Sequence, residues 1–470
     1  MRILLPTGSA TREMVKCAAA GFDADVVVTG DIASFLTPHT LHQLIRKGTY
    51  DLVIVSGMCT ASFEQVERET GIPVYRGPRH AADLALILPV LDSITLSRTI
   101  PADDFLAAKK AEDAFRRIGE LEHRAGFDFV IRDIKIGGRS RIKVLAEVMD
   151  AHRRDNIRGM VEHYFDLGAD IVDLGFGFDA TARDVFRIFS LLEDIDQPLA
   201  VDSQDPDLIR AALVRADIVL SLQETNIPVV GACVADAGAA AVVVPGNSTL
   251  KANLAMAERV GIECIIADPL LQPVGSGLVK SLKQFGHTAY PLFFGAGNVV
   301  ELLDADSVGA NALLAGMAHE VGASIIFTSE HSDKTSGSIR EMRRATEMMV
   351  LTKGRPYPKD LGIDLLVLKE KRRRREPPVE YETITAVKKM PGDITYDPKG
   401  NFRIGIDDDQ IIAVINGKAV RGKRWQDVLS TIISHGDVSL LDHAGYLGRE
   451  LYKAELAIRY GRSFEQDGEF

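Results

Sequence analysis

The sequence lacks the features that mark secreted, membrane-spanning and zinc-thiolate proteins. It has only four cysteines among 470 residues, and the absence of a CxxC or Cys/His pattern argues against a disulfide framework and a zinc site. We interpret Cys17, Cys59, Cys233 and Cys264 as reduced core residues, because free cysteine is among the most buried residue types. No apolar stretch approaches the roughly 18 residues of a membrane helix, and the first apolar run is too short for a signal peptide. We therefore expect a cytoplasmic protein with no membrane partner.

A surplus of basic residues is absent as well. The chain has 55 Lys and Arg against 66 Asp and Glu, which gives a formal charge of -11. This balance argues against a nucleic-acid partner, because nothing supplies a wide basic surface. With 46% hydrophobic residues, the chain can bury large cores in two to four domains. Small-molecule chemistry is the expected activity.

The pattern of apolar runs predicts an α/β protein built around a central (β/α)8 TIM barrel. Residues 1–98 have the β/α alternation of an open, Rossmann-like N-terminal domain, and 99–127 form a charged connecting helix. Residues 128–352 form the barrel, 353–380 a basic Pro-bounded linker, and 381–470 a small α+β domain. The barrel prediction rests on eight strand-like runs spaced by helix-length segments, at 142–148, 170–175, 198–203, 217–222, 241–246, 263–268, 291–296 and 324–329.

Three local features refine this prediction. FDFVIRDIKIGG predicts a hairpin that turns at Gly137–Gly138 before the first barrel strand. The basic run at 371–375 is interpreted as a solvated linker, with an anion-attracting flap as the alternative. The tail predicts an amphipathic helix over 446–460 with Leu447, Leu451 and Leu456 facing inward. His443 and Arg449 beside it are interpreted as caps or solvated charges, with ligand or subunit contact as the alternative.

Polar residues gather where the predicted barrel strands end, which is the face that carries the chemistry in such barrels. A carboxylate there can accept two parallel hydrogen bonds from the aminopyrimidinone edge of a flat heterocycle. Asp202 and Asp268 are the first candidates, because an acid that ends a buried strand needs a partner. The other candidates at the strand ends are Glu147, Asp150, Asp173, Ser203, Ser221, Gln223, Asn247, Gly295, Asn298, Ser329, Glu330 and His331.

Helix capping is the alternative role for several of these residues. Ser203 or Asp205 could start the helix in DPDLIRAAL, and Asn247 is interpreted first as the cap of a helix that opens at 248 or 249. Asn298 follows glycines that let the backbone approach a ligand closely, so a binding role is preferred there.

Five motifs resemble the pterin-binding barrel family, which contains dihydropteroate synthase and the methyltetrahydrofolate:corrinoid methyltransferases. They are GADIVDLGFGFD (168–179), PLAVDSQDPDLIRAAL (198–213), ADIVLS (216–221), IIADPLLQPVG (265–275) and PLFFGAGNVV (291–300). IKIGGRSRIKVLAEVMDA (134–151) is similar to the family's hairpin and first strand. The whole chain looks closest to the dihydropteroate synthase-related proteins of methanogens and methylotrophic bacteria, which use tetrahydromethanopterin-type carriers.

The resemblance implies a pterin as substrate or ligand and assigns roles to particular residues. Asp202 and Asp268 match the aspartates that hold the pterin ring, and Asn298 matches an asparagine of the methyltransferases. Glu147 falls where the synthase has an asparagine associated with magnesium, so Mg²⁺ is a candidate cofactor. Together with the other residues at the strand ends, the predicted pterin-binding set is Asp173, Asp202, Ser221, Gln223, Asn247, Asp268, Gly295 and Asn298.

The chain also departs from the synthase pattern. The Ser-Arg-Lys of the synthase's strand 7 is replaced in this chain by Gly297-Asn298-Val299. The Arg-Val-His of the synthase's strand 8 is replaced by residues 327–329. The strand-4 asparagine of both branches is replaced by Leu220. Lys334, predicted as catalytic with Asp202 and Asp268, could replace the lost contacts to the leaving group. His331, Arg340 and the 371–375 run are further replacements.

The leading hypothesis for the reaction is a condensation in tetrahydromethanopterin-type cofactor biosynthesis. A 6-hydroxymethyl-dihydropterin pyrophosphate would lose pyrophosphate to an attacking arylamine, in a homodimeric enzyme. One alternative is methyl transfer from a methylated tetrahydropterin to a corrinoid protein, although the chain has no DxHxxG cobalamin signature. The other is pterin binding without catalysis.

Overall fold

The computed structural model describes residues 1–79, 81–286, 288–353, 357–359, 361–368, 382–387 and 396–468. The chain divides into two compact units, Met1–Pro377 and Pro378–Phe470. No helix in the described part of the chain is long and apolar enough to cross a membrane. All four cysteines are free, but Cys17 is exposed and only Cys59 is fully buried, so the prediction that all four are core residues was wrong for Cys17.

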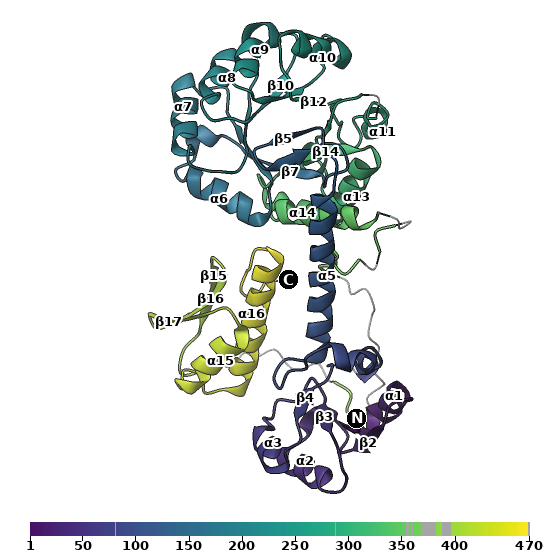
Figure 1. The fold of residues 1–470 in the computed structure, drawn as a ribbon. Helices are drawn as coiled ribbons and strands as arrows, with labels where there is room; N and C mark the ends of the chain where they lie inside the picture. The colour runs from purple at the N-terminus through teal and green to yellow at the C-terminus, as the bar shows by residue number, and fades with distance from the viewer. Residues whose placement is uncertain are drawn as a thin grey trace. The chain divides into compact units, whose positions relative to one another are not determined.

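The first unit begins with a four-stranded parallel sheet in the order β2-β1-β3-β4 (Figure 1). The strands have buried aliphatic side chains, as parallel sheets covered on both faces do. The strands and helices of this part are β1 (Ile3–Thr7), α1 (Arg12–Ala18), β2 (Ala24–Val28), α2 (Pro38–Ile45), β3 (Leu52–Val55), α3 (Glu64–Thr70), β4 (Val74–Arg76), α4 (Leu84–Ile87) and α5 (Ala102–His123).

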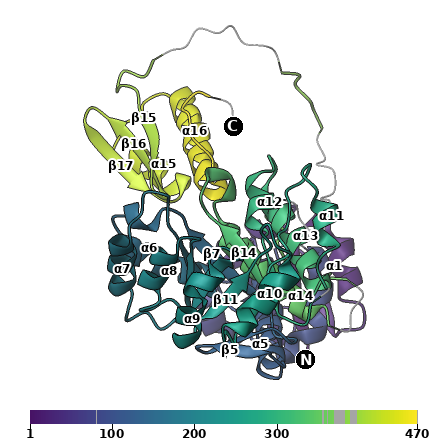
Figure 2. The same cartoon turned by 90° about the horizontal axis from the view of Figure 1, so that it is seen from above.

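The central part is a closed barrel of eight parallel strands, as predicted. Each of the eight predicted runs overlaps one barrel strand, and two of these strands begin one residue earlier than predicted. The strands are β7 (Lys143–Val148), β8 (Ile171–Gly175), β9 (Leu199–Asp202), β10 (Ile218–Leu222), β11 (Ala240–Val243), β12 (Ile265–Ala267), β13 (Leu292–Phe294) and β14 (Ala323–Ser329). The helices are α6 (Ile157–Leu167), α7 (Ala182–Leu191), α8 (Pro206–Ala212), α9 (Ile227–Asp236), α10 (Leu250–Arg259), α11 (Leu278–Leu282), α12 (Gly297–Glu301), α13 (Ser307–Glu320) and α14 (Ser338–Leu351). Figures 1 and 2 show α6 to α10 outside the strands.

Several barrel helices start at residues whose side chains accept a backbone hydrogen bond. Asp205 caps α8 by accepting from the Asp207 amide at 2.8 Å, as predicted, with Pro206 in the first turn. Thr249, and not Asn247, caps α10 by accepting from the Ala252 amide. The predicted cap at Asn247 was therefore wrong, because the extended residue that immediately precedes the helix is Thr249.

A short hairpin lies at the amino end of the barrel. It consists of β5 (Phe129–Ile131) and β6 (Ile134–Ile136), whose Ile131 and Ile136 join the apolar cluster inside the barrel. The hairpin turns at 132–133 and not at Gly137–Gly138 as predicted. Both glycines follow β6 with positive φ, and Gly138 leaves no space for a Cβ beside the Gly126 carbonyl. The two glycines therefore lie in the connection between β6 and β7 and not in the turn of the hairpin.

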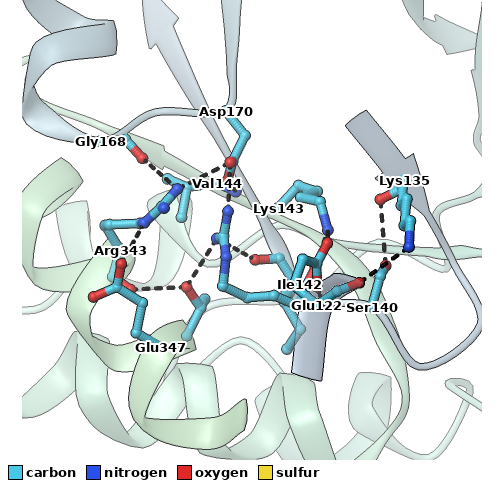
Figure 3. Close-up of polar contacts among 12 residues, drawn as sticks. Glu122, Lys135, Ser140, Ile142, Lys143, Val144, Gly168, Asp170, Arg343 and Glu347 are labelled. Atoms are coloured by element: carbon cyan, nitrogen blue, oxygen red, sulfur yellow. Dashed lines mark hydrogen bonds and ion pairs between the residues drawn. The ribbon is translucent and has the colours of Figure 1, made fainter. Parts of the chain in front are cut away.

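Charged side chains form a hydrogen-bonded network at this amino end of the barrel (Figure 3). Asp170 accepts from Arg141, from Arg343 at 2.9 Å and from the Val144 amide at 2.8 Å. Lys143 donates to Glu122 of α5 at 2.9 Å. The network connects α5 and α14 to the amino ends of β7 and β8. This end of the barrel lies opposite the carboxyl ends of the strands, where the chemistry is expected.

Part of the predicted linker 353–380 packs against the same region. Leu361 and Ile363 are buried in a cluster with Ala114 and Ile118 of α5, so this part is not a solvated linker. The run at 371–375 lies outside the described residues, and its two alternative interpretations stay predictions.

The second unit contains a three-stranded antiparallel sheet and two helices. Its elements are β15 (Arg403–Asp407), β16 (Gln410–Ile415), β17 (Lys418–Gly422), α15 (Trp425–Ser434) and α16 (Leu441–Tyr460). Leu447 and Leu451 are buried as predicted, but Leu456 is only partly buried, since Ala454 and Ala457 occupy the helix positions that face the sheet. The helix begins five residues earlier than predicted.

The two polar residues singled out near this helix have partners within the unit. His443 Nδ1 lies 3.2 Å from Asp397 Oδ2, and Arg449 pairs with Glu450. Asp397 also accepts from the Ser439 hydroxyl and the Leu440 amide. His443 is therefore not a cap, because it lies inside α16, and the carboxylate of Asp397 accepts from the amide of Leu440 at the start of the helix.

Candidate active site at the carboxyl ends of the barrel strands

Four of the predicted acids occupy inward-facing positions at the carboxyl ends of barrel strands. Each lies two residues after an apolar residue of the cluster inside the barrel, and side chains in a strand alternate with a period of two. The pairs are Leu145 and Glu147, Ile171 and Asp173, Ala200 and Asp202, and Ile266 and Asp268. The same alternation that fills the barrel with apolar side chains therefore places a carboxyl group above it on β7, β8 and β9 and just after β12.

Three of these acids form a compact cluster. Glu147 pairs with Asp173 in the register of β7 and β8, and one carboxylate oxygen each of Glu147, Asp173 and Asp202 lie within 4.8 Å of one another. Asp173 is 0% exposed, and both of its carboxylate oxygens lack a side-chain hydrogen-bond partner in the part of the chain that the structure describes. A buried carboxylate normally has hydrogen-bond partners. The lack of such partners at Asp173 indicates that the cluster serves to bind a ligand and not to stabilise the fold.

Gly175 gives the cluster space. A Cβ at this position would lie 2.5 Å from Glu147 Oε1, so any larger residue at the end of β8 would displace the Glu147 carboxylate. The sequence alone gave no sign of this role, because the GFGF motif has several glycines and only the register across β7 and β8 selects one.

Ser221 supplies a hydroxyl to the cluster from β10. Its Oγ donates to Asp202 Oδ1 at 2.7 Å. The register between β10 and β11 shifts between Val219 and Leu222, and Ser221 has φ of 64°. A bulge with a left-handed, non-glycine residue costs free energy and re-aims a side chain. Here it turns Ser221 toward Asp202.

Burial raises the pKa of each acid in the cluster. Burial is the largest cause of the raised pKa of Glu147, followed by the charges of Asp202 and Asp150. Burial also raises the pKa of Asp173 well above its ordinary value, and the charges of Asp202 and Glu147 raise it further. Burial also raises the pKa of Asp202, against the lowering effect of the Ser221 hydrogen bond. The cluster thus disfavours three simultaneous negative charges unless a ligand compensates them.

Asp268 lies across the mouth from this cluster, because two strands separate β12 from β9 and two separate it from β7. It is 7% exposed and its Oδ1 accepts from the Leu270 amide at 2.8 Å. Leu270 has φ of 64°, so the turn after Pro269 is strained. Burial raises the pKa of Asp268 to about 7, offset in part by the Leu270 amide and increased by Asp202.

Other predicted residues take part in neighbouring polar contacts. Gln223 donates from Nε2 to Gln204 Oε1 at 3.2 Å, beside Ser221. Asn247 is exposed, and its backbone N–H donates to Glu224 Oε1 at 2.7 Å. No contact of either side chain with the cluster is found among the described residues.

The residues after β13 and β14 also lie apart from the cluster's contacts. Asn298 is exposed in the first turn of α12, where it follows the partly buried Gly295 and the buried Ala296 and Gly297. Lys334 donates to the Glu301 carbonyl at 2.5 Å and to Asp304 at 3.3 Å. His331 and Arg340 are exposed. The expected role of Lys334 toward a leaving group stays a prediction, and its present partners belong to the end of α12.

The donor set of the cluster is suited to a hard cation. It offers carboxylate oxygens and no nitrogen or sulfur ligands, which is the preference of Mg²⁺ and Ca²⁺. The same oxygens can accept N–H groups of a heterocycle. Both kinds of ligand fit a site that is short of donors.

Fold and site define a (β/α)8 barrel protein with a buried acidic site at the carboxyl ends of its strands. Over 99% of its length the chain is 34% identical to the uncharacterized protein MJ0107 of Methanocaldococcus jannaschii, with 98% of that protein covered. The chain belongs to the same family as that protein. A family model described as PterinBD-DUF4346 matches residues 396–467, and this description agrees with the resemblance to pterin-binding proteins.

Solved structures of dihydropteroate synthases are also similar. The Yersinia pestis enzyme is 17% identical, with 48% of this chain and 98% of that chain covered and a TM-score of 0.38. The Thermus thermophilus enzyme is 18% identical, with 46% and 95% covered and a TM-score of 0.38.

Proposed function

We propose that the barrel binds a reduced pterin, with Asp202 and Asp268 accepting hydrogen bonds from the aminopyrimidinone edge of the ring. The observation that carries this proposal is the placement of two inward-facing carboxyl groups, the half-buried Asp202 on β9 and the buried Asp268 after β12. The Ser221 hydroxyl and the Leu270 amide each satisfy one oxygen, and a carboxylate can accept up to about four hydrogen bonds. A ring rich in N–H donors would supply the missing partners.

The sequence motifs and the family model support the same ligand. The motifs at 198–213 and 265–275 contain Asp202 and Asp268 themselves, and the description of the matching family model names a pterin-binding domain. The two lines are independent, because the family model matches the second unit and the motifs lie in the barrel.

The reaction we propose is a pteroate-synthase-like transfer. An arylamine nitrogen attacks the methylene carbon of a 6-hydroxymethyl-dihydropterin pyrophosphate, the carbon–oxygen bond breaks, and pyrophosphate leaves while the amine loses a proton. The chain's own residues would contribute mainly position and charge: Asp202 and Asp268 fix the ring, and the buried site keeps it from water. Magnesium would neutralise charge on the leaving pyrophosphate, with Glu147 as a ligand. Tetrahydromethanopterin-type cofactor biosynthesis is the proposed pathway.

Calorimetric titration with 6-hydroxymethyl-7,8-dihydropterin tests the binding step. We expect Asp202→Asn and Asp268→Asn each to weaken binding about 10- to 100-fold, since a hydrogen bond to a charged group contributes roughly 1.5–3 kcal/mol. Asp179→Asn is the matched control, because Asp179 is exposed after β8 and pairs with Arg153. Equal affinity in all three variants would place the pterin elsewhere or exclude it.

The second candidate is methyl transfer to a corrinoid protein. The observation that favours it is the engagement of Lys334 by Glu301 and Asp304, which takes away the predicted contact to a pyrophosphate. Incubation with a methylated tetrahydropterin and cob(I)alamin would change the corrinoid absorption spectrum if this candidate holds. Release of pyrophosphate with an arylamine supports the condensation instead, and pterin binding with neither outcome supports a non-catalytic binding protein.

A further inference from the structure

The cluster of Glu147, Asp173 and Asp202 is short of positive partners. Three neighbouring strands contribute its carboxylates, and one hydroxyl, that of Ser221, donates to it. No ion pair joins any of the three to a Lys or Arg within the described residues. Uncompensated burial of several carboxylates is costly, so the fold retains this arrangement at a cost that a ligand could offset.

We infer that Glu147, Asp173 and Asp202 together bind a divalent cation of the Mg²⁺ or Ca²⁺ type, as a site formed by the protein itself. The inference deepens and rests on the proposed function, because it concerns the same mouth of the barrel. It goes beyond a contact between Glu147 and a substrate-bound magnesium ion, since the deepest ligand is Asp173.

Asp173 is the observation that points to the cation. It is 0% exposed, both oxygens lack a side-chain hydrogen-bond partner among the described residues, and its carboxylate lies inside the cluster. A proton shared by two carboxylates would leave the third acid without a partner. A divalent cation accepts one oxygen from each of the three.

The dimensions of the cluster agree with this inference. Oxygens on opposite sides of an ion lie about twice the metal–oxygen distance apart, which is about 4.2 Å for Mg²⁺ and about 4.8 Å for Ca²⁺. The three ligand oxygens lie within 4.8 Å of one another. This upper limit is compatible with one ion of either kind that takes one oxygen from each acid. The open side of the mouth would leave the remaining positions to water or substrate oxygens.

The two parts of the mouth would then bind different groups. Asp268 lies outside the three-acid cluster and is left to the heterocycle, while Asp202 borders both. An anionic group of a substrate near Glu147 would then meet the cation, which is the chemistry expected of a pyrophosphate or another phosphate ester.

Binding of Mn²⁺ to the full-length, EDTA-treated protein tests the inference. Electron paramagnetic resonance measures free Mn²⁺ during the titration, and Mg²⁺ and Ca²⁺ are added as competitors. We expect one Mn²⁺ per chain, with affinity weakened about tenfold or more in Glu147→Gln and in Asp173→Asn, since each substitution removes an anionic ligand. Asp179→Asn is the control and should bind as the native chain does.

Each other result overturns the inference. Absence of Mn²⁺ binding in the native chain excludes the site, and unchanged affinity in both cluster variants places the ion elsewhere. Circular dichroism of the metal-free variants checks that they are folded, and substitution of unpaired acids should not unfold them. Pterin titrations without metal separate the two proposals: pterin binding without Mn²⁺ binding removes the cation and leaves the proposed function, and the reverse removes the pterin.

Discussion

The two ends of the barrel treat buried charge in opposite ways. At the amino end, Asp170 precedes β8 and is surrounded by Arg141, Arg343 and the Val144 amide. Three residues later, toward the carboxyl end of the same strand, Asp173 has no positively charged partner among the described residues, and only the Leu174 amide exerts a lowering effect on its pKa. Both aspartates are buried, so burial alone does not distinguish a structural acid from a functional one.

The pKa directions express the same difference. Burial opposes ionisation of Asp170, but the two arginines outweigh it and lower its pKa. At Asp173 burial and the neighbouring acids act together and raise the pKa. The amino end is complete without a ligand, whereas the carboxyl end requires a proton, a cation or an N–H donor to be complete.

The largest expected effect comes from substituting Asp170, which precedes β8, with Asp173 of β8 as the comparison. Asp170→Asn should lower the free energy of unfolding by about 3–5 kcal/mol, because it leaves the buried Arg141 without its anion. Urea denaturation followed by far-ultraviolet circular dichroism measures this, since the one tryptophan, Trp425, lies in the second unit and does not report on the barrel.

Asp173→Asn is the matched comparison on the same strand. In metal-free buffer it should leave the free energy of unfolding unchanged or raise it, because it removes an acid that has no partner to lose. A loss as large as that of Asp170→Asn would mean that both ends are structural and that the contrast between them is wrong.

Much of this contrast could be predicted from the sequence, and the part that could not has a physical reason. The eight strands follow from apolar runs with helix-length spacing, and Asp202 and Asp268 follow from acids that end such runs. The sequence does not tell whether an acid has a partner, because Arg343 lies 173 residues from Asp170 in the chain. The same limit hid the proximity of Gly175 to Glu147, which depends on the register of two strands.

Local signals misled where two explanations shared one residue pattern. The glycine pair at 137–138 resembles a hairpin turn, but it follows the hairpin and carries the close approach to Gly126. Asn247 resembles a cap, but Thr249 lies nearer the helix and has the required extended conformation. Lys334 was expected at the mouth for its charge, and its partners Glu301 and Asp304 could not be foreseen without the fold.

The pH dependence of stability gives the next largest effect. Asp268 has a pKa of about 7 in the folded chain against its ordinary 3.8, so the folded state retains a proton that the unfolded state releases between these values. Its contribution is fully present below pH 3.8 and is lost as the pH rises through 7, a total on the order of 4 kcal/mol.

Asp268→Asn isolates this contribution. Between pH 5 and pH 8 the variant should gain about 2–3 kcal/mol relative to the native chain, because it has no proton to lose. Denaturation of the metal-free protein at the two pH values measures the gain. A pH-independent difference between the two chains would show that Asp268 is ionised and paired in the fold, as Asp170 is.

The smallest expected effect on stability comes from Gly175→Ala, and it sharpens the comparison at the carboxyl end. The added Cβ would meet Glu147 Oε1, the far end of a flexible side chain, and Gly175 has no positive φ. The free energy of unfolding should therefore change by less than about 1 kcal/mol. The displaced carboxylate should nevertheless weaken Mn²⁺ binding, because a cation site depends on ligand position more than the fold does. Equal Mn²⁺ affinity in Gly175→Ala and the native chain would mean that Glu147 reaches the ion by another rotamer, so the space at Gly175 would not be part of the site.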